Sequence, residues 1–174
     1  MDAQRYYEKE QLRSGQEVVI RAAHPDDMER LVEAFGKLEA NSIYMRFFGP
    51  KKEITAAELQ RFRDTDFETC VRLLCTIIRD GREIAIASGL YVRVAQDAAE
   101  VAMIVEEDYQ RQGISSCLLS HLGKIARAKG IRKFTAEVLP HNSAMLGVFR
   151  RCGWPMKART SEGTVHITLV LEPG

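Results

Sequence analysis

Residues 110–116, with the sequence QRQGISS, combine residue types that could bind an anion. They follow an apolar run and open an amphipathic one, so a strand is expected to lead into a helix here. Amides in the first turn of a helix have no acceptor inside it, and the helix dipole favours an anion at that end. Gly113 would let a phosphate approach the backbone closely. Any strand-turn-helix can present such amides, so a phosphate site and a plain structural turn both stay open.

The pattern around this loop predicts an α/β fold built on a mixed sheet. Two β-branched runs meet at Asp80 and Gly81, a hairpin signal, and the helix that begins at Gly113 separates two later strands. A helical crossover makes those two strands parallel, so we expect a mainly antiparallel sheet with helices on both faces. The expected strands span 17–22, 69–80, 83–94, 100–105 and 133–138, with two short strands around 162–163, and the expected helices begin near residues 25, 54, 113 and 143.

Length and composition indicate one globular domain. The chain has 174 residues, of which 45% are hydrophobic, enough for a single core. We assign residues 1–16 to an N-terminal extension and residues 17–174 to the domain. The 25 basic and 24 acidic side chains nearly cancel, which disfavours a nucleic-acid partner.

The cysteines indicate a reducing environment. Cys70, Cys75, Cys117 and Cys152 form no CxxC pair and lie in apolar or helical stretches, so packed free thiols are expected and no metal site is. The N-terminus lacks the apolar segment of a signal peptide, and no run of about 18 apolar residues could span a membrane. We therefore expect a cytoplasmic protein without a membrane partner. His121, beside the apolar stripe of its helix, is expected to be solvated.

Several motifs resemble those of one enzyme superfamily. Residues 110–115 match the Q/R-x-x-G-x-G/A signature of the GNAT acetyltransferases, with Ser115 where Gly or Ala is usual. Residues 141–144 (HNSA) resemble the N-x-x-A stretch of that family, and residues 149–154 (FRRCGW) resemble its Y-E-K-x-G-F ending. The element order is similar over residues 17–171. The chain thus resembles GNAT N-acetyltransferases, and bacterial protein lysine acetyltransferases of the Pat type in particular, which implies the GNAT fold and acetyl-CoA as cofactor.

The resemblance also implies which residues bind the cofactor. In the family, the loop binds the coenzyme A pyrophosphate, and the preceding strand hydrogen-bonds the pantetheine arm through its backbone. Asn142 corresponds to a side chain that contacts the same arm, although an Asn before a helix is equally expected as an N-cap. The implied cofactor residues are Ile104, Val105, Gln110, Arg111, Gln112, Gly113, Ile114, Ser115, Ser116 and Asn142.

An amine acceptor must lose a proton before it can attack a thioester. A free lysine at pH 7 sits about 3.4 units below its pKa, so deprotonation costs roughly 4 to 5 kcal/mol, and a positioned carboxylate is the usual remedy. Glu100 matches the position of the catalytic glutamate in related protein lysine acetyltransferases; Glu106 and Glu107 are weaker alternatives. A charged residue at a strand end is often only solvated. Phe149 replaces the tyrosine that serves many relatives as an acid, so that role is absent or falls to Tyr109 or water.

These features predict acetyl transfer to an amine by direct attack, because no activated Ser or Cys arrangement is visible. Residues 42–60 resemble the matching segment of protein lysine acetyltransferases, so a protein lysine is the expected acceptor, and acyl-CoA synthetases are candidate partners of this stand-alone version. The aromatic residues Tyr44, Phe47 and Phe48 in that segment would fit a shallow cleft, although core packing explains them too. A small-amine acetyltransferase and a non-catalytic acyl-CoA sensing module are the alternatives; the oligomeric state stays open.

Overall fold

A single mixed sheet organises the computed structural model, which describes residues 1–47 and 54–171. Its eight strands have the order β1-β2-β3-β4-β5-β6-β8-β7. The pair β5 and β6 is parallel and the other neighbouring pairs are antiparallel, which confirms the predicted mainly antiparallel sheet. The strands are β1 Tyr7–Gln11, β2 Glu17–Ala22, β3 Cys70–Arg79, β4 Arg82–Ala95, β5 Ala98–Val105, β6 Lys133–Val138, β7 Met156–Ser161 and β8 Thr164–Val170.

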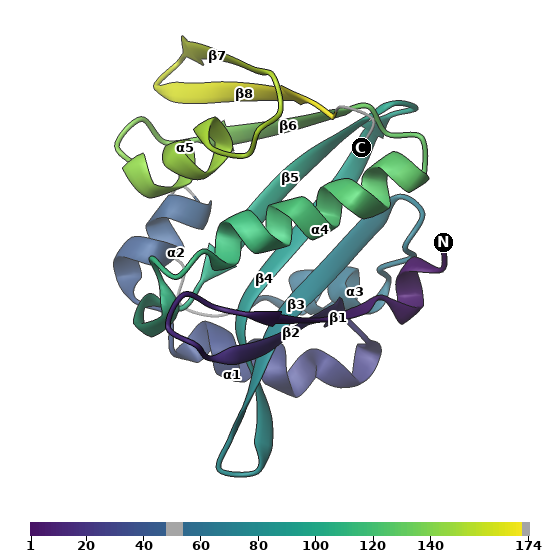
Figure 1. Ribbon diagram of the computed structural model, residues 1–174, viewed down its shortest axis with the longest axis vertical. Helices are drawn as coiled ribbons and strands as arrows, with labels where there is room; N and C mark the ends of the chain where they lie inside the picture. Colours follow the sequence, from purple (N-terminus) through teal and green to yellow (C-terminus); the bar gives the residue numbers. More distant parts are fainter. Residues whose placement is uncertain (48–53, 172–174) are drawn as a thin grey trace.

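Helices cover both faces of the sheet (Figure 1). One face, the α4 face, carries α4 and α5, and the opposite face, the α2 face, carries α1, α2 and α3. The helices are α1 Met28–Gly36, α2 Ala40–Phe47, α3 Ala56–Arg63, α4 Ile114–Ala128 and α5 Ser143–Arg150, with short 3-10 turns η1 Ala3–Arg5, η2 Pro25–Asp27 and η3 Glu107–Tyr109. Among the described residues, no helix is long and apolar enough to cross a membrane.

Both predicted hairpin turns form as two-residue turns. Asp80 and Gly81 have φ values of 52° and 78°, and Glu162 and Gly163 have 53° and 75°. Two successive residues with positive φ match the right-handed twist of the flanking strands. The first turn sets the long β3-β4 hairpin that forms the middle of the sheet.

Close packing holds α4 against the sheet. The side of β3 and β4 that carries Leu73 and Gly89 faces α4, and a Cβ on Gly89 would lie 3.1 Å from Leu122 Cδ1. A glycine at this position therefore allows the helix to approach the strands closely. The four cysteines are free, as expected.

Residues 1–16, predicted as an extension, contribute to the sheet and the core. β1 pairs with β2, and the Tyr6 ring is buried. Tyr6 Oη hydrogen-bonds His121 Nδ1, and His121 Nε2 lies 2.8 Å from Glu10 Oε1. The expectation that His121 is solvated was wrong, because β1 covers this part of α4 and its side chain is 12% exposed. The N-terminal strand is thereby fastened to α4.

A buried ion cluster fixes the entry to α1. Arg21 Nη2 donates to Asp27 Oδ1 at 2.7 Å and Arg21 Nε to Glu83 Oε2 at 3.1 Å, while the backbone N–H of His24 donates to Asp27 Oδ2 at 2.7 Å. Burial by itself would raise the pKa of Asp27, but these donors outweigh it, so the pKa is lowered. The cluster therefore stabilises the fold as long as Asp27 is ionised.

Replacing Asp27 by Asn should lower the free energy of unfolding by about 3–5 kcal/mol at pH 7, because it leaves Arg21 buried with one fewer carboxylate. The native pKa of Asp27 is lowered, so its contribution is complete above the unfolded carboxyl pKa and is lost as the pH falls below about 4. The difference in the free energy of unfolding between wild type and Asp27→Asn, measured by urea unfolding, should therefore become smaller from pH 7 to pH 3. Asp26→Asn, at the exposed neighbour, is the control; equal midpoints for wild type and Asp27→Asn would contradict the assignment.

Candidate functional site

The central feature of the site is the separation of β5 and β6. These strands pair at three positions, the last of which joins Glu100 to Thr135, although β5 continues to Val105 and β6 to Val138. A cavity of about 910 Å³ lies where they diverge. Its size suits a cofactor or another extended ligand. Glu100 therefore stands at the vertex of a gap in the sheet.

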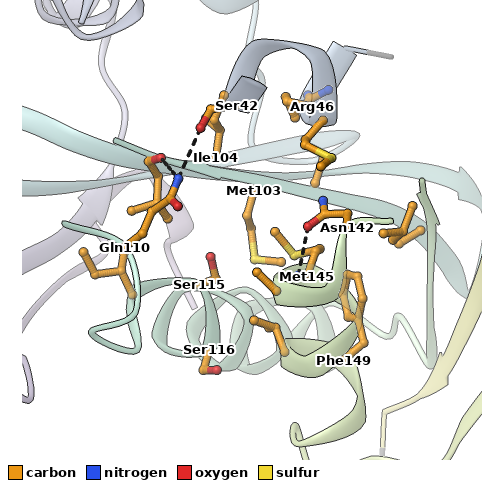
Figure 2. Close-up of a pocket in the computed structure, with 18 of the residues that line it drawn as sticks. Ser42, Arg46, Met103, Ile104, Gln110, Ser115, Ser116, Asn142, Met145 and Phe149 are labelled. Atoms are coloured by element: carbon orange, nitrogen blue, oxygen red, sulfur yellow. Dashed lines mark hydrogen bonds between the residues drawn. The ribbon is translucent and has the colours of Figure 1, made fainter. Parts of the chain in front are cut away.

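The cavity is lined from both faces of the sheet. Residues alternate along β5, so Met103 points toward Met145 of α5 on the α4 face, and Ile104 points toward Ser42 of α2 on the other (Figure 2). Glu100 has the same parity as Ile104 and belongs to the α2 face. One ligand could thus enter from each face and the two could meet in the gap.

The loop before α4 presents unpaired amides to the cavity. Gly113 has φ 88° in the left-handed region, and the first amide that bonds back to it is Cys117 N–H, at 3.0 Å from Gly113 O. The amides of Ile114, Ser115 and Ser116 precede that bond and have no acceptor within the helix. These residues and Arg111 line the cavity. The geometry is that of an anion cradle at a helix N-terminus.

Two glutamines anchor this loop in different directions. Gln110 Nε2 donates to Val105 O at 3.0 Å and to Ser42 Oγ at 3.2 Å, which joins the loop to β5 and α2 (Figure 2). Gln112 points toward the β1-β2 turn, where its Oε1 accepts from Ser14 Oγ at 2.7 Å. Gln110 lines the cavity and Gln112 lies outside that lining. Gln110 is thus part of the cavity wall, whereas Gln112 holds the loop against the β1-β2 turn from outside the cavity.

Arg13, which no sequence motif marks, also lines the cavity. It lies in the turn between β1 and β2, and a Cβ on Gly113 would be 3.8 Å from Arg13 Nε. A guanidinium beside the amide cradle adds the charge that a phosphate needs. Its sequence signal is weak, because an arginine in a short polar turn has no motif around it.

Asn142 and Phe149 line the cavity on the side of α5. Asn142 Oδ1 accepts from Met145 N–H at 3.2 Å, so Asn142 is the N-cap of α5 and also lines the cavity. Phe149 is 1% exposed and forms part of the cavity wall without a polar group. Tyr109 lines the cavity as well, and its Oη is buried without a hydrogen-bond partner among the described residues.

The three candidate carboxylates have separate positions. Glu100 is exposed and lines the cavity. Glu106 lies past the end of β5, where burial raises its pKa. Glu107 Oε1 accepts from the backbone N–H of Glu39 at 3.0 Å. Of these three, the geometry favours Glu100 as a base for a ligand in the gap.

Comparisons with known proteins point to one enzyme family. The model of the acetyltransferase (GNAT) family matches residues 38–154. The acetyltransferase Pat of Mycolicibacterium smegmatis is 31% identical over 145 residues, which are 82% of this chain and 43% of that protein. The chain thus spans less than half the length of this relative.

Two solved structures are similar in fold. The GNAT domain of S. lividans PAT has 36% identity and a TM-score of 0.87, with 95% of this chain and 97% of that chain covered. The structure of yncA from Salmonella typhimurium, solved with acetyl-CoA, has 16% identity and a TM-score of 0.70, with 90% of this chain and 95% of that chain covered. At that identity the second structure supports the fold alone.

Proposed function

The chain belongs to the GNAT acetyltransferase family and is an acetyl-CoA-dependent N-acetyltransferase; from this premise we propose that its acceptor is a lysine side chain of a protein. One observation supports the arrangement of the reaction most directly. The gap between β5 and β6 has an anion cradle at its α4 face and Glu100 at its α2 face. Cofactor and acceptor could therefore approach from opposite faces.

The cavity residues fit acetyl-CoA. We propose that the pyrophosphate lies against the amides of residues 113–116, with Arg13 and Arg111 adding positive charge. The inner edge of β5 carries the backbone groups of Met103 and Val105, which could bond the pantetheine amides beside Asn142. The backbone of Ile104 points toward Ser88 of β4 instead. Gln112 supports the loop through Ser14 in this proposal. The cofactor supplies a thioester, which an amine can attack.

Glu100 is the proposed proton acceptor. It lines the cavity at the last paired position of β5 and β6, on the face from which the acceptor would enter. A carboxylate there, directly or through water, can take the proton that the amine must lose when its nitrogen bonds to the acetyl carbon. The thiol of the leaving group has an ordinary pKa of about 8.5, so the thiolate can leave without a side-chain acid. Phe149 cannot supply one.

The acceptor side resembles a surface cleft. Tyr44 is 44% exposed and Phe47 37% exposed on α2, next to the cavity mouth; Phe48 lies outside the described residues. Exposed aromatic residues beside a catalytic gap suit a protein surface better than a closed small-molecule pocket. The Pat and PAT relatives belong to the same family. An acyl-CoA synthetase, which the resemblance of residues 42–60 implies, is the partner to try first. The free thiols fit the proposed cytoplasmic location.

A substrate comparison tests the proposed acceptor. We expect saturating acetyl-CoA to give specific modification of lysines in a proteome, with acyl-CoA synthetases foremost, above the non-enzymatic background. Polyamines, aminoglycosides and free amino acids should show lower kcat/KM. Efficient turnover of one free amine without any specific protein modification would replace the protein acceptor by a small amine. No turnover of any amine, despite CoA binding, would favour a sensing module.

Replacing Gly113 by Glu should weaken CoA binding at least about 100-fold, because a carboxylate would face the phosphates at the cradle. The positive φ of Gly113 strains any side chain, so Gly113→Ala is the matched control that measures strain without charge. Calorimetry with CoA on both folded variants separates the two effects. Equal affinity of wild type and Gly113→Glu would move the pyrophosphate elsewhere.

Replacing Glu100 by Gln keeps the size of the side chain and removes the proton acceptor. We expect kcat to fall about 100-fold or more with CoA affinity retained, and the loss to be smaller at high pH, where more acceptor amine is already neutral. Glu107→Gln is the control, since Glu107 bonds to the backbone of Glu39. A normal pH-rate profile for Glu100→Gln would transfer the role to another group or to water.

A further inference from the structure

Arg72 of β3 is a partly buried cation on the α2 face with few hydrogen-bond partners. Its Nη1 donates to Ser88 Oγ at a long 3.4 Å, and its guanidinium lies 5.3 Å from the centre of the Phe62 ring. Its Nε is buried and has no hydrogen-bond partner among the described residues. Burial lowers the pKa of Arg72, and the positive charge of Arg46 lowers it further. A guanidinium in this state is well suited to receive an anion.

Arg46 of α2 is the second member of the pair. It lines the cavity together with Glu100, and its guanidinium lies 4.9 Å from the centre of the Phe47 ring. Burial lowers the pKa of Arg46, although the charges of Glu100 and Glu58 oppose that change. Neither Arg46 nor Arg72 has a carboxylate oxygen within 4.0 Å among the described residues.

An arginine that is more deeply buried than these two has carboxylates in contact. Arg21, whose side chain is 10% exposed, has Asp27 at 2.7 Å and Glu83 at 3.1 Å. Burial of a cation is ordinarily balanced in this way, because an unpaired charge away from water costs several kcal/mol. Arg46 and Arg72 are partly buried and have no carboxylate in contact among the described residues, since Glu100 and Glu58 act on Arg46 only from beyond ion-pair distance. The two guanidinium groups therefore offer a place for an anion.

The register places this pair beside the reacting gap. Arg72 lies opposite Leu90, and Leu90 lies opposite Ala102, which lines the cavity. Arg72 thus begins two strand spacings, roughly 10 Å, from Ala102, and its side chain projects from the same face as Glu100. If the amine of an acceptor faces Glu100, a second group that lies a few bonds from this amine would be within reach of Arg46 and Arg72.

We propose that the acceptor carries a carboxylate close to its reactive amine, and that Arg46 and Arg72 bind this carboxylate while the amine faces Glu100. The inference rests on the proposed acetyl transfer and specifies its acceptor. The carboxylate can be the side chain of an Asp or Glu that neighbours the lysine in a folded protein, or the α-carboxylate of a free amino acid. Polyamines and aminoglycosides, which bring only positive charge, are poor acceptors because both arginines repel them.

Two matched acceptor pairs test the proposal, with free CoA thiol as the readout. The first pair is a series of single-lysine peptides with Glu at one of the three positions on either side, each compared with its Gln counterpart. The second pair is free lysine and lysinamide, which differ in the carboxylate alone. At low salt we expect kcat/KM to be about tenfold or more higher for the carboxylate member of at least one pair. The pair that responds identifies the source of the carboxylate.

Arginine variants assign the effect to this site. Arg46→Gln and Arg72→Gln should each bring the ratio of carboxylate to amide acceptor close to one, whereas Arg63→Gln, an exposed arginine of nearby α3, should leave the ratio unchanged. Arg46→Gln alone decides the matter if Arg72→Gln does not fold. A wild-type ratio near one in both pairs, or a ratio that neither variant reduces, overturns the proposal.

A binding measurement separates this inference from the proposed function. Calorimetry of each Glu and Gln peptide, with the protein saturated by CoA, does not depend on turnover. If no amine is acetylated but a Glu peptide still binds about tenfold more tightly than its Gln counterpart, the acetyl transfer fails and the carboxylate site stands. If acetylation proceeds equally on both peptides and both bind equally, the carboxylate site fails and the acetyl transfer stands.

Discussion

The unpaired inner edges of β5 and β6 are the constraint on which the site depends. On its other side β5 pairs with β4 as far as Val105, and β6 pairs with β8 as far as Val138, so each strand is held up to its end. Beyond Glu100 the two strands separate, and their facing backbone groups lie along the cavity. Polar groups at such an edge need partners, and an extended ligand with amide groups can supply them. The break in the sheet is thus the feature that would accommodate the pantetheine arm in the proposed complex.

The precision of the amide cradle comes from the packing of α4. Gly89 lets the helix approach the sheet, and Gly123 lets Trp154 pack against the helix, since a Cβ on Gly123 would lie 2.3 Å from Trp154 Cη2. The bond network of Tyr6, His121 and Glu10 adds β1 as a further support. The helix N-terminus is therefore fixed relative to β5 before any ligand binds, which reduces the ordering cost of binding.

The sequence predicted those parts of the site that local pattern controls. Strand periodicity, the turn at Asp80 and the helix that begins after Gly113 located the crossover and the cradle, because each depends on neighbouring residues. Arg13 was not predicted as a site residue, and His121 was wrongly predicted to be solvated. Both environments depend on β1 folding back across α4, which is a long-range contact. Arg72 did carry a signal, as a charge inside an apolar strand run. The direction of a side chain such as Gln112 cannot be derived from a motif, because the partner Ser14 is distant in sequence.

Direct transfer fits the chemistry of this site better than an acyl-enzyme route. Cys117 lies on the first turn of α4, and burial, aided by the charge of Glu10, raises the pKa of its thiol to about 11. At neutral pH roughly one molecule in ten thousand would hold it as the nucleophilic thiolate. Cys75 is less reactive still, with a pKa raised to about 12 by burial. In the proposed reaction an acceptor amine at Glu100 would need no such relay, because the gap would give it access to the thioester from the α2 face while the departing thiolate would stay on the α4 face. The proton and the leaving group would then depart by opposite faces of the sheet, and neither would require a side chain that the site lacks.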